Sequence, residues 1–128
     1  MRGRQVPVMQ KAATGHGMAP SGAIDLAHLE RATFGDRALR HEVLSLFQRQ
    51  AATLGAELAQ ADSDRVRADI AHRLRGAALG VGAMAVAEAA AAFERAPENA
   101  AQLAAALARL AASIAEARAA AKEIIGGD

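Results

Sequence analysis

One histidine, His72, lies in a stretch whose apolar and polar residues alternate with the period of a helix. Successive residues of an α-helix are about 100° apart. The apolar side of this stretch consists of Val66, Ile70, Leu74, Ala77 and Val81. The side that carries His72 also carries Arg65, Ala68, Asp69, Arg75, Gly76 and Leu79. We therefore expect the imidazole to face water, where it can act as a nucleophile toward another protein.

The residues around His72 resemble the phosphoacceptor motif of histidine-containing phosphotransfer (HPt) domains. In that motif the histidine is followed by a hydrophobic residue, a cation, a glycine, small residues, and a second glycine with a small neighbour. The corresponding residues here are Leu74, Arg75, Gly76, Ala77, Ala78, Gly82 and Ala83. The family usually has Lys in place of Arg75 and often Ser in place of Ala77. The resemblance covers residues 23 to 125 and implies an all-α bundle that carries phosphoryl groups.

The resemblance also implies a role for each residue near His72. Nε2 of His72 would attack the phosphorus of an aspartyl phosphate on a receiver domain. The Mg²⁺ of the reaction would be bound by that receiver, with no cofactor in this chain. Arg75, one turn on, would approach the phosphoryl oxygens with charge-assisted donors. Gly76 would leave room for the receiver's active-site loop.

Three further residues complete the site that the resemblance implies. Counted from Gly82 and Ala83, Glu94 occupies the place where many family members carry a polar residue that bonds Nδ1 of the histidine. We assign Glu94 that orienting role, because a partner on Nδ1 leaves the lone pair on Nε2. Leu79 and Ala68, on the exposed face, would form a small apolar contact area for the receiver.

The composition predicts a single all-α domain. The 128 residues include 3 Phe and no Trp or Tyr, and alanine dominates, which is typical of closely packed helices. The formal net charge of +1 gives no argument for nucleic-acid binding. Because the chain has no Cys and no Glu-x-x-His pair, we expect neither a disulfide framework nor a metal site.

No segment predicts membrane insertion or export. The longest apolar stretch that we identify runs from Ala83 to Phe93 and is interrupted by Glu88, far short of the roughly 20 apolar residues that span a bilayer. The apolar run from Val6 to Met9 is too short for the core of a signal peptide. We therefore expect a cytoplasmic protein.

Cap residues and apolar spacing predict five helices. A short helix begins at Asp25, with Ile24 and Leu29 as a hydrophobic staple, and ends near Thr33. The others run from Asp36 to about Ala61, from about Asp64 to Leu79, from about Val86 to Phe93 and from about Leu103 to Ile124. The apolar stripe of the second helix is assigned to Leu39, Val43, Leu46, Phe47, Leu54 and Leu58. Gly80 and Gly82 are expected to end the His72 helix, and Pro97 to end the helix after it.

The short connections between these helices predict an antiparallel four-helix bundle with the short additional N-terminal helix as a lid over one end. Residues 1 to 22 combine several Gly and Pro residues with isolated basic residues and predict a flexible tail. Residues 23 to 128 form the predicted HPt domain.

Three functions remain open at this point. The favoured one is a phosphorelay carrier that serves receiver domains of response regulators and of a hybrid histidine kinase, with no kinase activity because the chain has no nucleotide-binding loop. The second is a non-phosphorylated helical adaptor, a pseudo-HPt, that binds receiver or kinase domains through the same face. The third is a kinase-type dimerisation helix pair. Four long helices in one chain make a second chain unnecessary, so we expect a monomer.

Overall fold

The computed structural model describes residues 22–127, and within that range it contains helices and no strand. The helices are α1 (Leu26–Ala32), α2 (Arg37–Gln60), α3 (Asp64–Val81), α4 (Met84–Glu94) and α5 (Ala100–Gly127). Their order and bounds agree with the sequence prediction to within a few residues. The predicted tail lies almost wholly outside the described residues.

Polar side chains begin four of the five helices. Free backbone N–H groups of a first helical turn need acceptors, and short polar side chains supply them. The bonds run from His28 N to Asp25 Oδ1 (3.1 Å), from Leu39 N to Asp36 Oδ1 (3.0 Å), from Val66 N to Ser63 Oγ (3.2 Å) and from Gln102 N to Asn99 Oδ1 (2.8 Å). Helix α4 begins after Ala83 without a side-chain cap.

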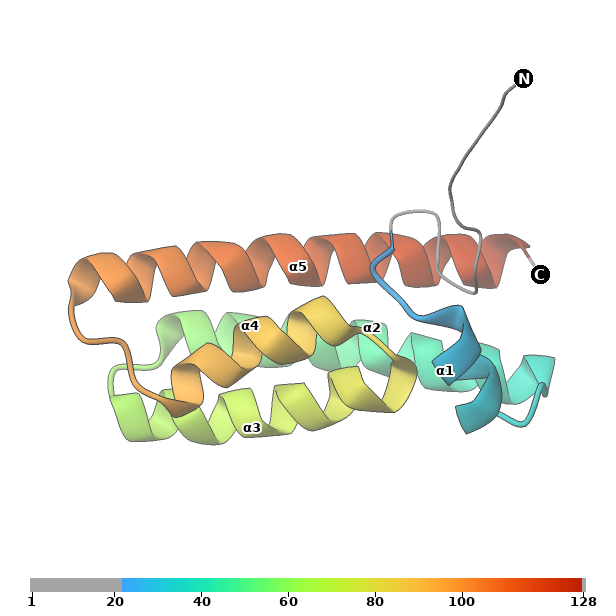
Figure 1. Cartoon of the computed structure of the whole chain (residues 1–128), viewed down its shortest axis with the longest axis horizontal. Coiled ribbons are helices and arrows are strands. Elements are labelled where there is room, and N and C mark those ends of the chain that lie inside the picture. Colours follow the sequence, from blue (N-terminus) through green and yellow to red (C-terminus); the bar gives the residue numbers. More distant parts are fainter. Residues whose placement is uncertain (1–21, 128) are drawn as a thin grey trace, which may run out of the picture.

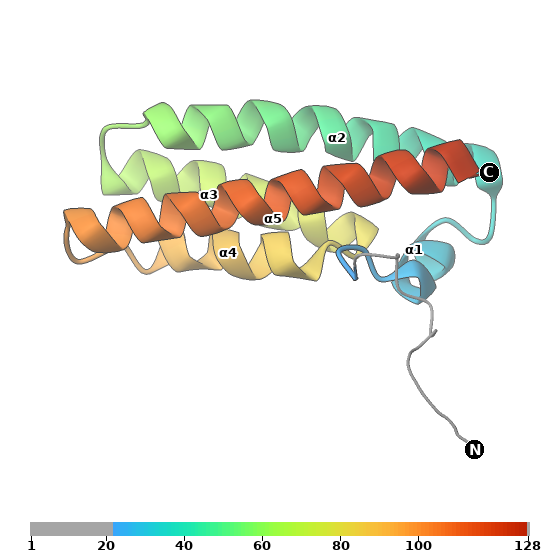
Figure 2. The same ribbon diagram turned by 90° about the horizontal axis from the view of Figure 1, so that it is seen from above.

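The four long helices lie side by side and the chain reverses direction at each connection, as the colour order in Figures 1 and 2 shows. Helix α3 packs against α2 and α4, and α5 packs against the same two helices. The largest fully buried side chains are Phe47, Phe93, Ile24, Leu29, Leu44, Leu58, Leu74, Val86 and Thr33. Buried alanines fill much of the remaining space between the helices.

Helix α1 is held at the end of the molecule where α3 turns into α4 (Figure 1). Asp25 N donates to the carbonyl of Gly82 at 2.9 Å. The staple residues Ile24 and Leu29 are both fully buried. Gly82 has φ 81°, and a Cβ on it would lie 2.9 Å from the carbonyl oxygen of Asp25. The turn after α3 therefore needs glycine both for its left-handed backbone and for the close approach of α1.

Two details of α3 differ from the prediction. The helix continues through Gly80 and ends at Val81, because Gly82 alone takes the left-handed conformation that stops it. Val66 is 40% exposed. Arg67 occupies the inward place in this first turn: its side chain donates to the carbonyl of Ala61 at 2.8 Å and to Asp64 at 2.9 Å. Val66, one position earlier, is consequently at the edge of the buried face.

The assignment of Leu46 to the apolar stripe of α2 is wrong, since this residue is 45% exposed. At 100° per residue, Leu46 lies about 140° around the helix from Ala51, which is fully buried. Of the other predicted stripe residues, Phe47, Leu54 and Leu58 are buried, whereas Leu39 and Val43 are half-buried. Leu46 follows Val43 at a helical spacing of three, but Val43 is itself only half-buried, so Leu46 lies beyond the edge of the buried face.

The expectation that no segment is long and apolar enough to cross a membrane overlooked α5. Among residues 22–127, α5 is the one helix that passes this test by length and composition. Alanine is its commonest residue, at 13 of 28 positions. One side of the helix packs into the core through Leu110, Ile114 and Ala117.

Candidate functional site

His72 projects from the middle of α3 into solvent, and its side chain is 74% exposed. Ala71 and Leu74, its neighbours on the inner side of the helix, are fully buried. The core thus fixes the orientation of α3 around its axis and, with it, the direction of the imidazole. This placement agrees with the amphipathic pattern of the sequence.

Glu94, the last residue of α4, lies beside His72. The distance from His72 Nδ1 to Glu94 Oε1 is 3.4 Å, long for a hydrogen bond, and the Glu94 side chain is 32% exposed. The two residues are opposite each other because the chain reverses between Gly82 and Ala83, and both are a similar number of residues from that turn. The buried ring of Phe93 fixes the last turn of α4.

Arg75 reaches the other oxygen of the same carboxylate. Its Nη1 lies 3.9 Å from Glu94 Oε2, which is an ion-pair distance and too long for a hydrogen bond. The Arg75 side chain is about half exposed. Glu94 therefore bridges His72 and Arg75, and an anion added at Nε2 would meet a guanidinium that is only loosely held.

The His72 face of α3 also carries small and apolar residues. Gly76 is exposed, and nothing lies within 4 Å of the position of a Cβ on it. Leu79 is 38% exposed, whereas Ala68 is half-buried and contributes less surface than expected. Met84, the first residue of α4, is also exposed, but it lies at the opposite end of that helix from Glu94. The sequence analysis did not single out Met84, although it directly follows the turn that closes the motif.

The geometry favours one tautomer of the imidazole. A carboxylate beside Nδ1 stabilises a proton on that nitrogen, which leaves the lone pair on Nε2. Because the imidazole is 74% exposed, a protein-sized electrophile can approach it from solvent. Within the described part of the chain, no group of three or more His, Cys, Asp or Glu side chains is placed to hold a metal ion.

The structure thus brings together His72, Arg75 and Glu94, which the sequence analysis named as one site. Gly76 and Leu79 lie on the same face of α3. No protein-family model matches the chain, and no curated protein or solved structure shows a significant match to it.

Proposed function

We propose that this chain is a histidine-containing phosphotransfer protein of a phosphorelay. It accepts a phosphoryl group on His72 from the aspartyl phosphate of one receiver domain and passes it to another. The observation that carries the proposal is the imidazole of His72, which is 74% exposed and has a carboxylate beside Nδ1.

The reaction needs little from this chain beyond a placed nucleophile. The lone pair of Nε2 attacks phosphorus, the bond between phosphorus and the aspartyl oxygen breaks, and the receiver's aspartate leaves as a carboxylate. Nδ1 keeps its proton throughout, beside Glu94. Arg75 donates to the phosphoryl oxygens as they arrive. Transfer to the second receiver is the same step in reverse, so the chain carries the group without a net change.

The fold supports this proposal. We assign the four long helices to an antiparallel four-helix bundle, with α1 as an additional N-terminal helix over one end. In such a bundle the packed core holds each helix in one orientation, and so fixes where a side chain in the middle of a helix projects. Rigid support matters because transfer requires the nucleophile within a few tenths of an ångström of its reacting position.

The partners in this proposal are receiver domains of response regulators and of a hybrid histidine kinase. The chain acts as a monomer in the cytoplasm and uses the Mg²⁺ bound by the receiver. The exposed residues Gly76 and Leu79 let the receiver approach: the first through the absence of a side chain, the second through an apolar contact.

A small phosphodonor tests whether His72 is a competent nucleophile without any partner. We expect the reagent phosphoramidate to phosphorylate the protein at Nε2 of His72. The ³¹P NMR spectrum should then show a protein-bound phosphohistidine signal that is lost in acid and stable in base. His72→Gln should abolish the signal, while the matched variant His41→Gln should keep it. A signal that persists in His72→Gln would place the acceptor elsewhere, and an adaptor that does not accept phosphate would show none in either protein.

A further inference from the structure

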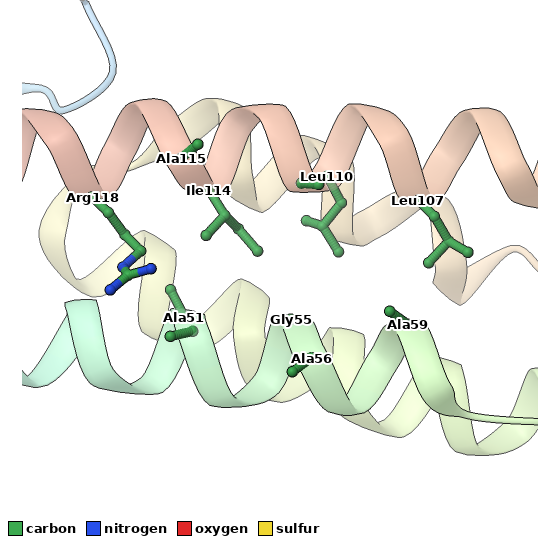
Figure 3. Close-up of a pocket in the computed structure, with 11 residues that line it drawn as sticks. Ala51, Gly55, Ala56, Ala59, Leu107, Leu110, Ile114, Ala115 and Arg118 are labelled. Atoms are coloured by element: carbon green, nitrogen blue, oxygen red, sulfur yellow. The ribbon is translucent and has the colours of Figure 1, made fainter.

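A groove of about 280 Å³ runs between α2 and α5. Its walls are Ala51, Ala52, Gly55, Ala56, Ala59, Leu107, Leu110, Ala111, Ile114, Ala115 and Arg118. Figure 3 shows the branched side chains of α5 pointing toward a face of α2 that carries only small residues. The groove exists because side chains no larger than a methyl group on α2 cannot fill the space opposite α5.

The floor of the groove is a fixed part of the core. Ala51, Leu110 and Ile114 are buried. At Gly55 the two helices are in direct contact, since a Cβ there would lie 2.9 Å from Cδ1 of Ile114. The rim is exposed and formed by alanines such as Ala56 and Ala115. The result is a shallow apolar trough with a rigid floor.

One end of the trough is cationic. Arg118 extends from α5 toward α2 at this end (Figure 3). The trough continues there into a polar hollow formed by Ser45, Gln48, Arg49, Ala52, Thr53 and Arg118. Gln48 Nε2 donates to the carbonyl of Arg118 at 3.0 Å and ties the two helices together. Neither Arg49 nor Arg118 forms an ion pair with another residue in the described range.

We propose that this groove binds one medium-chain fatty acid, with its alkyl chain in the trough and its carboxylate at Arg49 and Arg118. An apolar lining with a few polar groups at one end is the usual form of a small-molecule site. Two guanidinium groups without an anion are complementary to a carboxylate.

The dimensions select an alkyl chain over a helix. From Ala51 to Ala59, α2 advances about 12 Å at 1.5 Å per residue. A helix with its side chains is about 10 Å wide, so one turn of helix does not fit in a trough of 280 Å³. The site is formed by α2 and α5, whereas His72 is on α3. The inference therefore does not rest on the proposed phosphotransfer.

Titration with decanoate, below its micelle concentration, tests the proposal on the full chain. We expect saturable binding at one site by calorimetry. In ¹⁵N-resolved NMR spectra, the amide signals of residues 51–59 and 107–118 should shift, while the signal of His72 should not. Decyltrimethylammonium, with the same chain length and the opposite charge, should bind at least tenfold more weakly.

Paired variants separate the trough from its cationic end. Ala115→Leu places a branched side chain on the rim and should abolish decanoate binding, whereas Ala112→Leu, on α5 but outside the groove, should not. Arg118→Gln should weaken binding about fivefold, as expected for one exposed charge pair. Lys122→Gln, one turn further along α5, is the matched control.

Each of three results would overturn the proposal. Equal affinity for the cationic and anionic probes would remove the role of the arginines. Decanoate binding that survives Ala115→Leu would place the ligand elsewhere. A stable dimer in light scattering that Ala115→Leu dissociates would show that a second copy of the chain, and not a fatty acid, covers the groove.

Discussion

Glu94 acts on two neighbours at once, and this double contact gives the site its properties at the scale of single residues. One carboxylate oxygen lies beside Nδ1 of His72 and the other faces Arg75. Both contacts are long and partly exposed, so each is worth little to the stability of the fold. In the proposed function their effect is on orientation: Glu94 favours the Nδ1–H tautomer of His72 and holds the Arg75 guanidinium beside it, where it would meet a phosphoryl group on Nε2.

The tautomer of His72 should depend on Glu94. In Glu94→Ala we expect the Nδ1–H form to lose its preference, because water replaces the carboxylate at that nitrogen. The ¹⁵N chemical shifts of the imidazole report the two tautomers directly. Glu98→Ala, which removes an exposed carboxylate outside the site, is the control. Identical imidazole shifts in the wild-type protein and Glu94→Ala would leave Glu94 without an orienting role.

The rate of phosphotransfer should depend on Arg75. Arg75→Ala removes a charge-assisted donor that is about half exposed in the free protein, so we expect transfer to slow by about five- to tenfold, equal to about 1 to 1.4 kcal/mol. Arg75→Lys should have a smaller effect because the charge remains. Rapid-quench kinetics with a phosphorylated receiver measure this. Unchanged rates for Arg75→Ala would mean that the guanidinium does not touch the phosphoryl group.

At the scale of elements, the turn between α3 and α4 determines which residues meet. Gly82 ends α3 in the left-handed conformation, and its carbonyl accepts the bond from Asp25 N that anchors α1. The same turn sets the register that places Glu94 beside His72. A change in this turn would therefore disturb both α1 and the site.

Two glycines at the C-terminal end of α3, Gly80 within the helix and Gly82 just after it, should respond to alanine in opposite ways. Gly82→Ala forces a residue with a Cβ into the left-handed region and against the carbonyl of Asp25 at 2.9 Å, which we expect to destabilise the protein by about 2 to 3 kcal/mol. Gly80 is helical and has open space around it. Gly80→Ala should therefore stabilise by about 0.5 to 1 kcal/mol. Urea denaturation measures both values, and a neutral Gly82→Ala would contradict the described turn.

A larger side chain on the exposed face of α3 should weaken the binding of the receiver domain without lowering the stability of the protein. Gly76→Gln adds a side chain one turn from His72, in space that is open in the free protein. A better helix former there should raise the free energy of unfolding by up to about 1 kcal/mol. Receiver affinity, measured by calorimetry, should fall at the same time because the side chain obstructs the approach. Affinity equal to that of the wild type would place the docking face elsewhere.

At the scale of the whole molecule, the sequence is sufficient to predict the helices, because most of them begin at a polar cap and bury a regular apolar stripe. Asp25, Asp36 and Ser63 all cap the expected helices. His72 and its exposed face follow from the same periodicity. The pairing of His72 with Glu94 was reached through family resemblance, because periodicity alone does not tell which helices are neighbours.

The remaining features depend on tertiary packing. A helical wheel does not show that Arg67 takes the inward place at the start of α3 and leaves Val66 at the edge. The groove between α2 and α5 also requires the relative placement of two helices. Its sequence signal, the small residues at positions 51, 52, 55, 56 and 59 of α2, is equally typical of helices in close contact.

Transfer of label from a phosphorylated receiver domain to this chain tests the central claim most directly. Receivers of the source organism, phosphorylated with ³²P, should label the wild-type protein within seconds to minutes, and a second unlabelled receiver should then remove the label. His72→Gln should take up none, while its helicity is unchanged and its melting temperature stays within about 4 °C of that of the wild type, because the side chain lies outside the core. Label on the His72→Gln protein, or no label on a folded wild-type protein from any receiver, would contradict the account.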